Sequence, residues 1–336
     1  TYERYKNALK DDFGKTARSM FTDEPQFHQR TAVRKADPNA KFEAPWTPML
    51  KEKYFKKYSE DITEYLPELF FDFENGEISY TRYRFYDLIT ELFSNGFLKG
   101  CYDWCVKNGI SFTGHLMAES PIYFQTSLVG EAMRHYRNFH IPGIDILCNA
   151  VELDTAKQVQ SAIHQYGREG GLSELYGVTD WDFDFRGHKF QGDWQAALGV
   201  TLWAHHLSWV SMKAAAKRDY PASINYQSPW YKEYSYIENH FARINTALTR
   251  GKPVVKIGVI HPIESTWLHY IPMENTGEIQ EEAETNFQNL IKWLLYGNLD
   301  FDFISESLIP ELQNENNGLC IGEMKYDVIM FRLWKQ

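Results

Sequence analysis

The chain has 336 residues, of which 43% are hydrophobic and 24% charged, so its composition is that of a globular protein with room for one large α/β domain or two smaller ones. Its formal charge of −10 argues against nucleic acid as a partner, and no apolar run approaches the roughly 18 residues of a membrane span. Aromatic residues make up 16% of the chain, and Trp and Tyr in loops suit a site that stacks on sugar rings.

The apolar pattern predicts helices and strands in alternation through the first 200 or so residues. In chain order it predicts a helix over 2–14, a strand over 16–21, a polar loop to about residue 48, short helices over 49–58 and 61–74, a long buried helix over 79–107, a strand over 110–117, a helix over 126–138, a strand over 144–148, a helix over 154–166, a strand over 170–175, a helix over 187–198 and a strand over 199–204. The strands are apolar on both faces, which predicts a parallel sheet covered by helices.

The pattern changes after a polar, aromatic loop over 213–235, which is too long to serve only as a connection. A helix over 236–250 ends at Gly251, and it is followed by strands over 254–260, 301–304 and 326–330 with a helix over 286–296. We therefore expect a domain over residues 1–250 and a smaller α/β domain over 251–336.

The cysteines are predicted to be reduced structural thiols. Cys101 and Cys105 are four residues apart in a helical pattern, and no histidine stands at zinc-finger spacing from them. The other two are Cys148 and Cys320. No signal peptide begins the chain, which leaves a cytoplasmic protein and a secreted one with its signal removed as open alternatives.

Three glutamates follow predicted strands: Glu24 in FTDEPQF, Glu119 in GHLMAESP and Glu174 in LSELYG. Cleavage of a glycosidic bond needs one protonated and one ionised carboxyl group, and carboxylates that share a cleft push their pKa values apart. A single glutamate at a strand end is more often a helix cap or the partner of an arginine. Three in aromatic surroundings indicate a catalytic cleft.

Histidines and loop aromatics are the further candidates for sugar contacts. The histidines at strand ends are either packed structural groups or ligands of sugar hydroxyls, and they lack a metal motif such as HExxH. Trp209 and Trp230 lie in loops and fit a sugar platform best, whereas Arg218 is as readily the structural partner of Asp219. The predicted substrate-binding residues are Asp23, His115, Glu119, Tyr176, Trp181, His205, His206, Trp209, Arg218 and Trp230.

The segments that carry these residues resemble the second half of a glycoside hydrolase (β/α)₈ barrel. In order they are FTDEPQF, WTPMLKEKYFKKY, YLPELFFDF, FTGHLMAES, GIDILCN, GGLSELYG and GVTLWAHHLSW. They are similar to the group that spans family 42 β-galactosidases and family 106 α-L-rhamnosidases. The resemblance implies that Glu24 is the acid/base at the end of barrel strand four and that Glu174 is the second catalytic glutamate at the end of strand seven.

The same resemblance has further implications. The segment from Val254 is similar to the amidotransferase-like α/β domain that follows the family 42 barrel and serves in trimer formation. Barrel strands one to three have no counterpart, so the barrel does not close by itself, which implies a missing N-terminal segment or a partner such as a second copy. Calcium is the one cofactor that the similarity to family 106 implies, and no other is expected.

The expected fold is therefore a TIM (β/α)₈-type barrel that lacks its first strands, followed by a smaller α/β domain. The expected function is hydrolysis of a terminal glycosidic bond in a carbohydrate substrate, with neither nucleic acid nor membrane as a partner. One alternative is a non-catalytic carbohydrate-binding or assembly protein. Another is a metal-dependent hydrolase that uses His115, His205 or His206.

Overall fold

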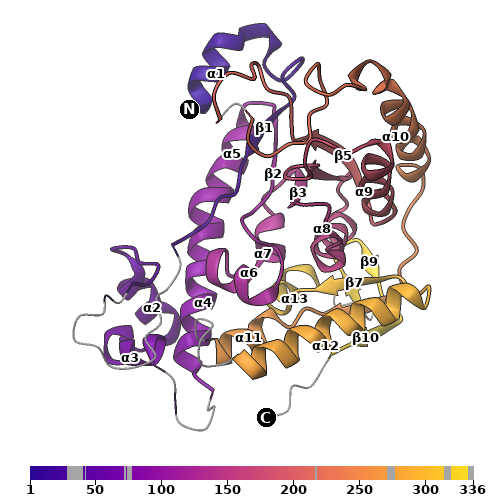
Figure 1. Cartoon of the computed structure of the whole chain (residues 1–336). Helices are drawn as coiled ribbons and strands as arrows, with labels where there is room; N and C mark the ends of the chain where they lie inside the picture. The colour runs from indigo at the N-terminus through magenta and orange to yellow at the C-terminus, as the bar shows by residue number, and fades with distance from the viewer. Residues whose placement is uncertain are drawn as a thin grey trace.

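A curled parallel sheet of five strands forms the centre of the molecule (Figure 1). The computed structural model describes residues 1–28, 41, 43–71, 73, 78–215, 218–270, 277–313 and 319–331. The strands are β1 (Ser19–Thr22), β2 (Ser111–Gly114), β3 (Ile141–Ile146), β4 (Gly171–Leu175) and β5 (Val200–His205), and they pair in sequence order. All four pairings are parallel, as the sequence predicts, and the curled sheet makes half of a barrel.

Helices cover one face of this sheet and form its core. Apolar side chains on that face, among them Phe112, Ile144 and Ile146, are buried. They pack against α5 (Lys99–Lys107), α7 (Ala132–Tyr136) and α8 (Leu153–Tyr166). Because side chains alternate along a strand, the residues between them point to the opposite, concave face.

The concave face is open. Phe21 on β1 is 39% exposed and Leu202 on β5 is 43% exposed, although both are strand residues. β1 and β5 are the edges of the sheet, and no other strand in the described part of the chain pairs with them. The described chain therefore forms a half-barrel, in line with the expected barrel that lacks its first strands, and a full TIM barrel is not confirmed.

The helices largely follow the prediction. Their bounds are α1 (Tyr2–Leu9), α2 (Leu50–Tyr58), α3 (Leu66–Phe70), α4 (Tyr80–Phe93), α5 (Lys99–Lys107), α6 (Ile122–Leu128), α7 (Ala132–Tyr136), α8 (Leu153–Tyr166), α9 (Phe185–Ala197), α10 (Ser235–Leu248), α11 (Ile263–His269), α12 (Gly277–Tyr296) and α13 (Ile309–Leu312). A π-helical turn over Ser94–Leu98 joins α4 to α5 into one long helix (Figure 1). The helix predicted over 126–138 is wrong in one respect, because it is split into α6 and α7 at Gly130, whose φ of +75° ends α6.

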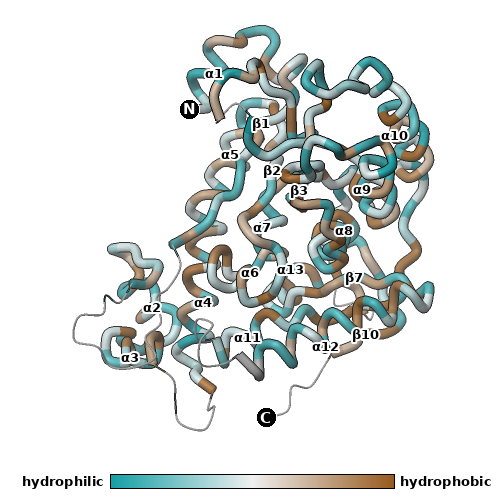
Figure 2. Tube along the Cα trace, viewed as in Figure 1, coloured by the Kyte–Doolittle hydropathy of each residue, from teal (hydrophilic) through white to brown (hydrophobic). Residues whose placement is uncertain are grey.

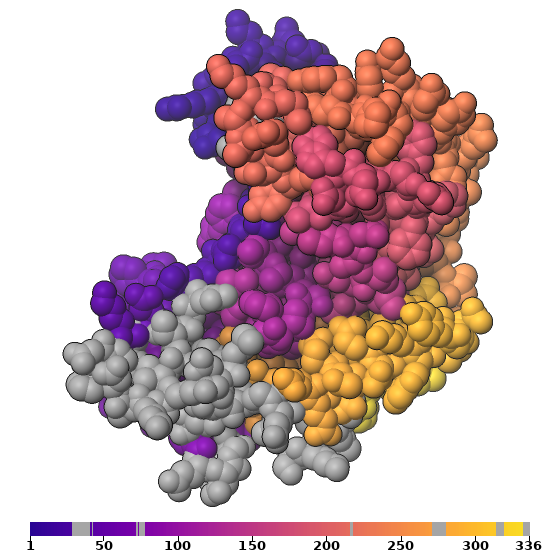
Figure 3. Space-filling model, viewed as in Figure 1, coloured from indigo at the N-terminus to yellow at the C-terminus, as the bar shows by residue number. Residues whose placement is uncertain are grey.

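A second parallel sheet, in the order β10-β6-β7, lies below the half-barrel. It consists of β6 (Ile257–Ile260), β7 (Phe301–Ile304) and β10 (Val328–Met330), and a small hairpin of β8 (Cys320–Ile321) and β9 (Met324–Lys325) accompanies it. Its core is partly shared, because Phe301 and Phe303 belong to the same buried cluster as Phe85 and Tyr86 of α4. A smaller buried cluster belongs to the C-terminal part alone, with Ile304, Ile321 and Tyr326 among its members. A second domain is therefore not confirmed. Figure 3 shows the C-terminal part, in yellow, against the magenta part of the surface.

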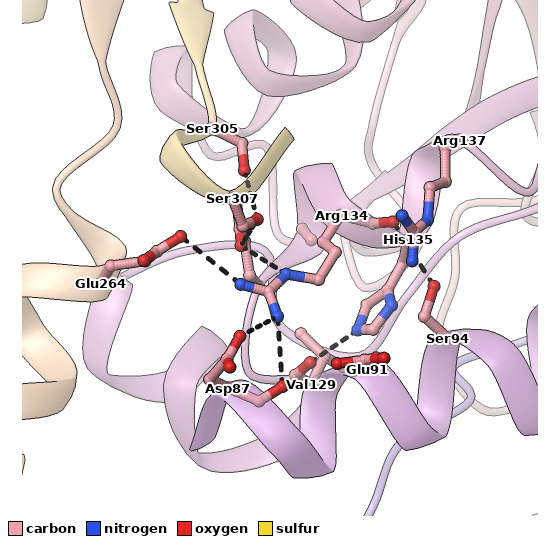
Figure 4. Close-up of polar contacts among 12 residues, drawn as sticks. Asp87, Glu91, Ser94, Val129, Arg134, His135, Arg137, Glu264, Ser305 and Ser307 are labelled. Atoms are coloured by element: carbon pink, nitrogen blue, oxygen red, sulfur yellow. Dashed lines mark hydrogen bonds and ion pairs between the residues drawn. The ribbon is translucent and has the colours of Figure 1, made fainter. Parts of the chain in front are cut away.

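A buried charge cluster also joins the two parts (Figure 4). The guanidinium of Arg134 on α7 lies 2.7 Å from Asp87 of α4, 3.1 Å from Glu131 and 3.4 Å from Glu264 of α11. It also lies over the ring of Trp267, 5.2 Å from its centroid. Each of the three carboxylates therefore shares the same buried cation, which ties α11 to the helices of the half-barrel.

The remaining predictions concern cysteines, loops and surfaces. All four cysteines are free thiols, as predicted. Much of the loop predicted to about residue 48, and part of the loop over 213–235, lie outside the described residues. Within the described ranges, no helix has the length and apolarity needed to cross a bilayer. Figure 2 shows hydrophobic residues at α8 and the strands beside it, and mainly hydrophilic residues along α1.

Candidate active site

The end of β1 carries the first two acidic groups of the site. β1 ends at Thr22, and Asp23 and Glu24 follow it before Pro25 stops the strand. Glu24 has a φ of +43°, in the left-handed region that few residues other than glycine adopt. Such backbone strain is often found at functional sites.

His115, directly after β2, lies at the centre of the site. Its side chain is only 1% exposed, and the ring of Phe21 packs edge-on against it at 5.5 Å. Its Nε2 lies 3.2 Å from Asp23 Oδ1 and 3.9 Å from Asp145 Oδ2, while its Nδ1 lies 3.8 Å from Glu174 Oε2. None of these contacts has hydrogen-bond geometry, so both ring nitrogens lack a hydrogen-bond partner within the described chain.

Asp145 and Glu174 lie side by side on neighbouring strands. They are paired residues in the register of β3 and β4, so their side chains project to the same concave face. The sequence reasoning missed Asp145. The available signal was a single acidic residue inside the apolar segment GIDILCN, at a position that alternation places opposite the buried Ile144 and Ile146.

Burial and mutual repulsion raise the pKa values of the carboxyl groups in this cluster. The pKa of Glu174 rises to about 7 because of burial and the nearby charges of Asp23 and Glu24. The pKa of Asp145 rises to about 8, mainly through burial and then through the charge of Glu174. Burial and Asp23 also raise the pKa of Glu24, while burial lowers that of His115 against the opposing effect of Asp23. The site therefore holds neutral and ionised carboxyl groups together near pH 7.

Two overlapping sets of donors in this cluster have the spacing of metal ligands. One set is Asp23, His115 and Glu174, the other Glu24, His115 and Asp145, and in each set the donor atoms lie within 4.8 Å of one another. His115 belongs to both sets. Ca²⁺ binds through oxygen ligands and seldom through imidazole, so the calcium expected from the resemblance fits this donor chemistry poorly.

Three of the predicted substrate-binding residues lie on the helix-covered side of the sheet. Glu119 is 4% exposed, and its Oε1 accepts a hydrogen bond from the Leu116 backbone at 3.0 Å. Tyr176 is 1% exposed, and its ring stacks on that of His205 with centroids 5.3 Å apart. His205 in turn pairs in register with the buried Leu175. Glu119, Tyr176 and His205 are therefore packed inside the protein, where they hold the loops after the strands. Their positions do not favour the predicted contacts with substrate.

The other predicted residues lie in the loops after β4 and β5. Trp181, 37% exposed, stacks on the buried Trp209 with ring centroids 5.1 Å apart. His206 packs edge-on against Tyr220 at 6.3 Å. Trp230 is half-buried before a short 3₁₀ turn, and Arg218 is exposed. The stacked tryptophans are the one aromatic surface of the predicted set with an exposed ring face, and their role in binding remains a prediction.

A cavity of about 700 Å³ lies beside the cluster rather than around it. It is lined by residues that follow Glu24 and His115 in the chain, including Gln26, Phe27, Met117 and Ala118. The carboxyl groups themselves are on the open concave face. A hollow of this volume can hold a sugar residue, and none of the acidic groups of the cluster lines it.

Comparison with known proteins relates this fold to glycoside hydrolases. No family model and no curated protein sequence matches the chain. The rhamnosidase from Novosphingobium sp. PP1Y superposes with a TM-score of 0.66 at 16% identity, over 98% of this chain and 30% of that enzyme. The cold-adapted β-galactosidase from Rahnella sp. R3 gives 0.54 at 12% identity, over 86% and 45%. The β-galactosidase from the haloarchaeon Halorubrum lacusprofundi gives 0.51 at 10% identity, over 84% and 45%.

The chain spans less than half the length of each of these three enzymes. At such identities the likeness concerns the fold alone. The fold is therefore glycosidase-like, as the sequence resemblance predicts.

Proposed function

We propose that this chain carries the catalytic pair of a glycoside hydrolase that cleaves a terminal glycosidic bond. Glu24 is the general acid that protonates the leaving oxygen. Glu174 is the second carboxylate, acting either as nucleophile at the anomeric carbon or as base toward a water molecule. The glycosidase-like fold supports this proposal at the level of reaction class.

The observation that carries the proposal is the convergence of Glu24 and Glu174 on the same buried histidine. The two residues are 150 positions apart in the chain and come from β1 and β4, which are not neighbours in the sheet. Even so, each has a carboxyl oxygen within 4.8 Å of a His115 ring nitrogen, and the charge of Glu24 raises the pKa of Glu174. Two carboxyl groups with separated protonation states are what glycosidic cleavage requires.

The proton distribution follows from the same geometry. Burial and Asp23 raise the pKa of Glu24, which favours the protonated form that a general acid needs. Glu174, with a pKa of about 7, ionises as the pH rises through neutrality. Hydrolysis should therefore increase as the pH rises through about 7 and Glu174 ionises.

The test is hydrolysis of a panel of 4-nitrophenyl glycosides, including the α-L-rhamnopyranoside and the β-D-galactopyranoside, by the full-length protein. Glu174→Gln should lower kcat by about 10²–10⁴-fold while the protein remains folded. Glu169→Gln is the matched control, because Glu169 is exposed at the opposite end of β4. Turnover by Glu174→Gln at the wild-type rate would overturn the assignment.

A second candidate is a non-catalytic carbohydrate-binding or assembly protein. The open concave face and the unpaired edges of β1 and β5 favour it, because an uncovered sheet is a surface for association. Under this alternative the protein binds glycans without hydrolysing any member of the panel, and Glu24→Gln leaves binding unchanged.

A further inference from the structure

Asp145 belongs to the site, but the proposed reaction uses only Glu24 and Glu174 and gives Asp145 no role. Its side chain is 12% exposed on the concave face, and its Oδ1 is buried without a hydrogen-bond partner among the described residues. The same is true of both ring nitrogens of His115, which is almost fully buried. Buried polar groups normally have hydrogen-bond partners, so the unpartnered carboxyl of Asp145 and the His115 Nε2 that lies 3.9 Å from it indicate a polar ligand.

We infer that Asp145 and His115 together bind one hydroxyl group of the substrate sugar, with Asp145 accepting and His115 donating the hydrogen bond. The inference rests on the proposed function. A hydroxyl group donates one hydrogen bond and accepts others, so it can satisfy a carboxylate and an imidazole N–H at the same time.

The distances fit one bridging oxygen atom. Asp145 Oδ2 and His115 Nε2 are 3.9 Å apart, which is too long for a direct hydrogen bond. An oxygen atom placed about 2.8 Å from each of them completes a triangle with good hydrogen-bond lengths. Glu24 also has an oxygen within 4.8 Å of both groups, so the bound hydroxyl would lie next to the proposed general acid.

The position of Asp145 argues for specificity rather than for acid–base chemistry. Asp145 pairs in register with Glu174, so both carboxyl groups project from the same wall of the site. The two reacting carboxyl groups of a glycosidase lie on opposite sides of the scissile bond. Asp145 is therefore a substrate-binding residue that selects for a hydroxyl group beside the reacting centre.

The test compares Asp145→Ala with the wild type on the nitrophenyl glycoside that the protein hydrolyses and on its monodeoxy analogues, each lacking one hydroxyl. We expect Asp145→Ala to lower kcat/KM by about 10–100-fold on the parent glycoside, as for loss of a buried hydrogen bond that leaves its partner unsatisfied. On one monodeoxy analogue the variant and the wild type should be equal, because the hydroxyl that Asp145 binds is gone. Asp145→Asn keeps an acceptor oxygen and should recover part of the loss.

Equal losses on the parent and on every analogue would overturn the inference, because a merely structural role does not distinguish one hydroxyl. Asp103→Ala, on the exposed face of α5, is the control variant. Circular dichroism of Asp145→Ala and Asp145→Asn checks that both fold. An activity that is lost with EDTA and restored by a divalent cation, with no analogue singled out, would instead assign Asp145 to a metal and also overturn the inference.

A failure of the proposed function can be told apart from a failure of this inference. If the wild type hydrolyses no glycoside, binding of L-rhamnose, D-galactose and their monodeoxy forms is measured by calorimetry. Binding that depends on both Asp145 and one hydroxyl would sustain the inference without catalysis. No binding of either sugar, or binding that Asp145→Ala leaves unchanged, would overturn it.

Discussion

At the scale of single residues, the site is a group of acids held around one buried histidine. Asp145 is surrounded by Glu174 on β4, Asp23 and Glu24 after β1, and Glu152 before α8, and all of these charges raise its pKa. Burial has the largest effect, because it disfavours the ionised form even without neighbours. The sequence shows the acids one by one. Their shared environment exists only in the folded chain.

This environment makes stability depend on pH. The Asp145 carboxyl titrates at its usual value of 3.8 in the unfolded chain and at about 8 in the folded protein. Between these values the folded protein keeps a proton that the unfolded chain has released, so the free energy of unfolding falls as the pH rises. Asp145→Asn removes this effect. It should be more stable than the wild type by on the order of 3 kcal/mol at pH 8, and close to it near pH 4.

Urea denaturation at the two pH values measures this difference. Asp103→Asn, which removes an exposed carboxylate, should follow the wild type at both. A stability difference between Asp145→Asn and the wild type that is the same at pH 4 and pH 8 would contradict the assigned burial of Asp145.

At the scale of elements, the close pairing of β1 and β2 positions Glu24 against His115. Gly114 ends β2 with a φ of +135°, which other residues rarely adopt. A methyl group at this position would collide with the backbone carbonyl of Thr22 on β1. The glycine therefore permits the strands to approach, and the two residues that follow Thr22 are the acids of the site.

Gly114→Ala should accordingly lower the free energy of unfolding by about 2–4 kcal/mol and reduce activity by displacing β1. Gly100→Ala, in α5 with open space around the new methyl group, is the matched control. It should stabilise the protein by about 0.5–1 kcal/mol through helix propensity. Thermal denaturation compares the two variants, and equal stability of both would show that the contact at Gly114 is unimportant.

At the scale of the whole molecule, the C-terminal sheet and the half-barrel form one packed unit. Phe85, Tyr86 and Phe301 belong to the core that the two parts share. The buried guanidinium of Arg134 forms ion pairs with Asp87 of α4 and Glu264 of α11, and so joins the two parts through charge as well. Removing that cation leaves several buried carboxylates without compensation, which is far less favourable than loss of a surface ion pair.

Arg134→Met should therefore lower the free energy of unfolding by about 3–5 kcal/mol. Lys99→Met removes the exposed partner of Asp103 and should change it by less than about 0.5 kcal/mol. Because the core is shared, unfolding of the wild type should be a single transition by both tryptophan fluorescence and circular dichroism. Two separate transitions would show that the C-terminal part folds independently.

The sequence by itself determined the order and type of the main elements. The periods of the apolar residues are local, so they predicted all five parallel strands, the long helix before β2 and α8. The same reasoning placed the C-terminal strands correctly. The separate domain that it predicts over 251–336 stays a prediction, because spacing along the chain carries no information about which cores merge. The order of segments such as FTDEPQF and GGLSELYG carried the resemblance to glycosidases.

Only the tertiary structure decided which polar groups meet. Asp145 looked like part of an apolar strand, and the pairing of β3 with β4 places it beside Glu174. Tyr176 and His205 looked like candidates for the cleft, and in the fold His205 pairs in register with the buried Leu175 while Tyr176, which follows β4 with a φ of +78°, stacks on His205. The reason is physical: whether a polar side chain near a strand end faces a cleft or a core depends on strand register and curl. Both are set by contacts between residues far apart in the chain.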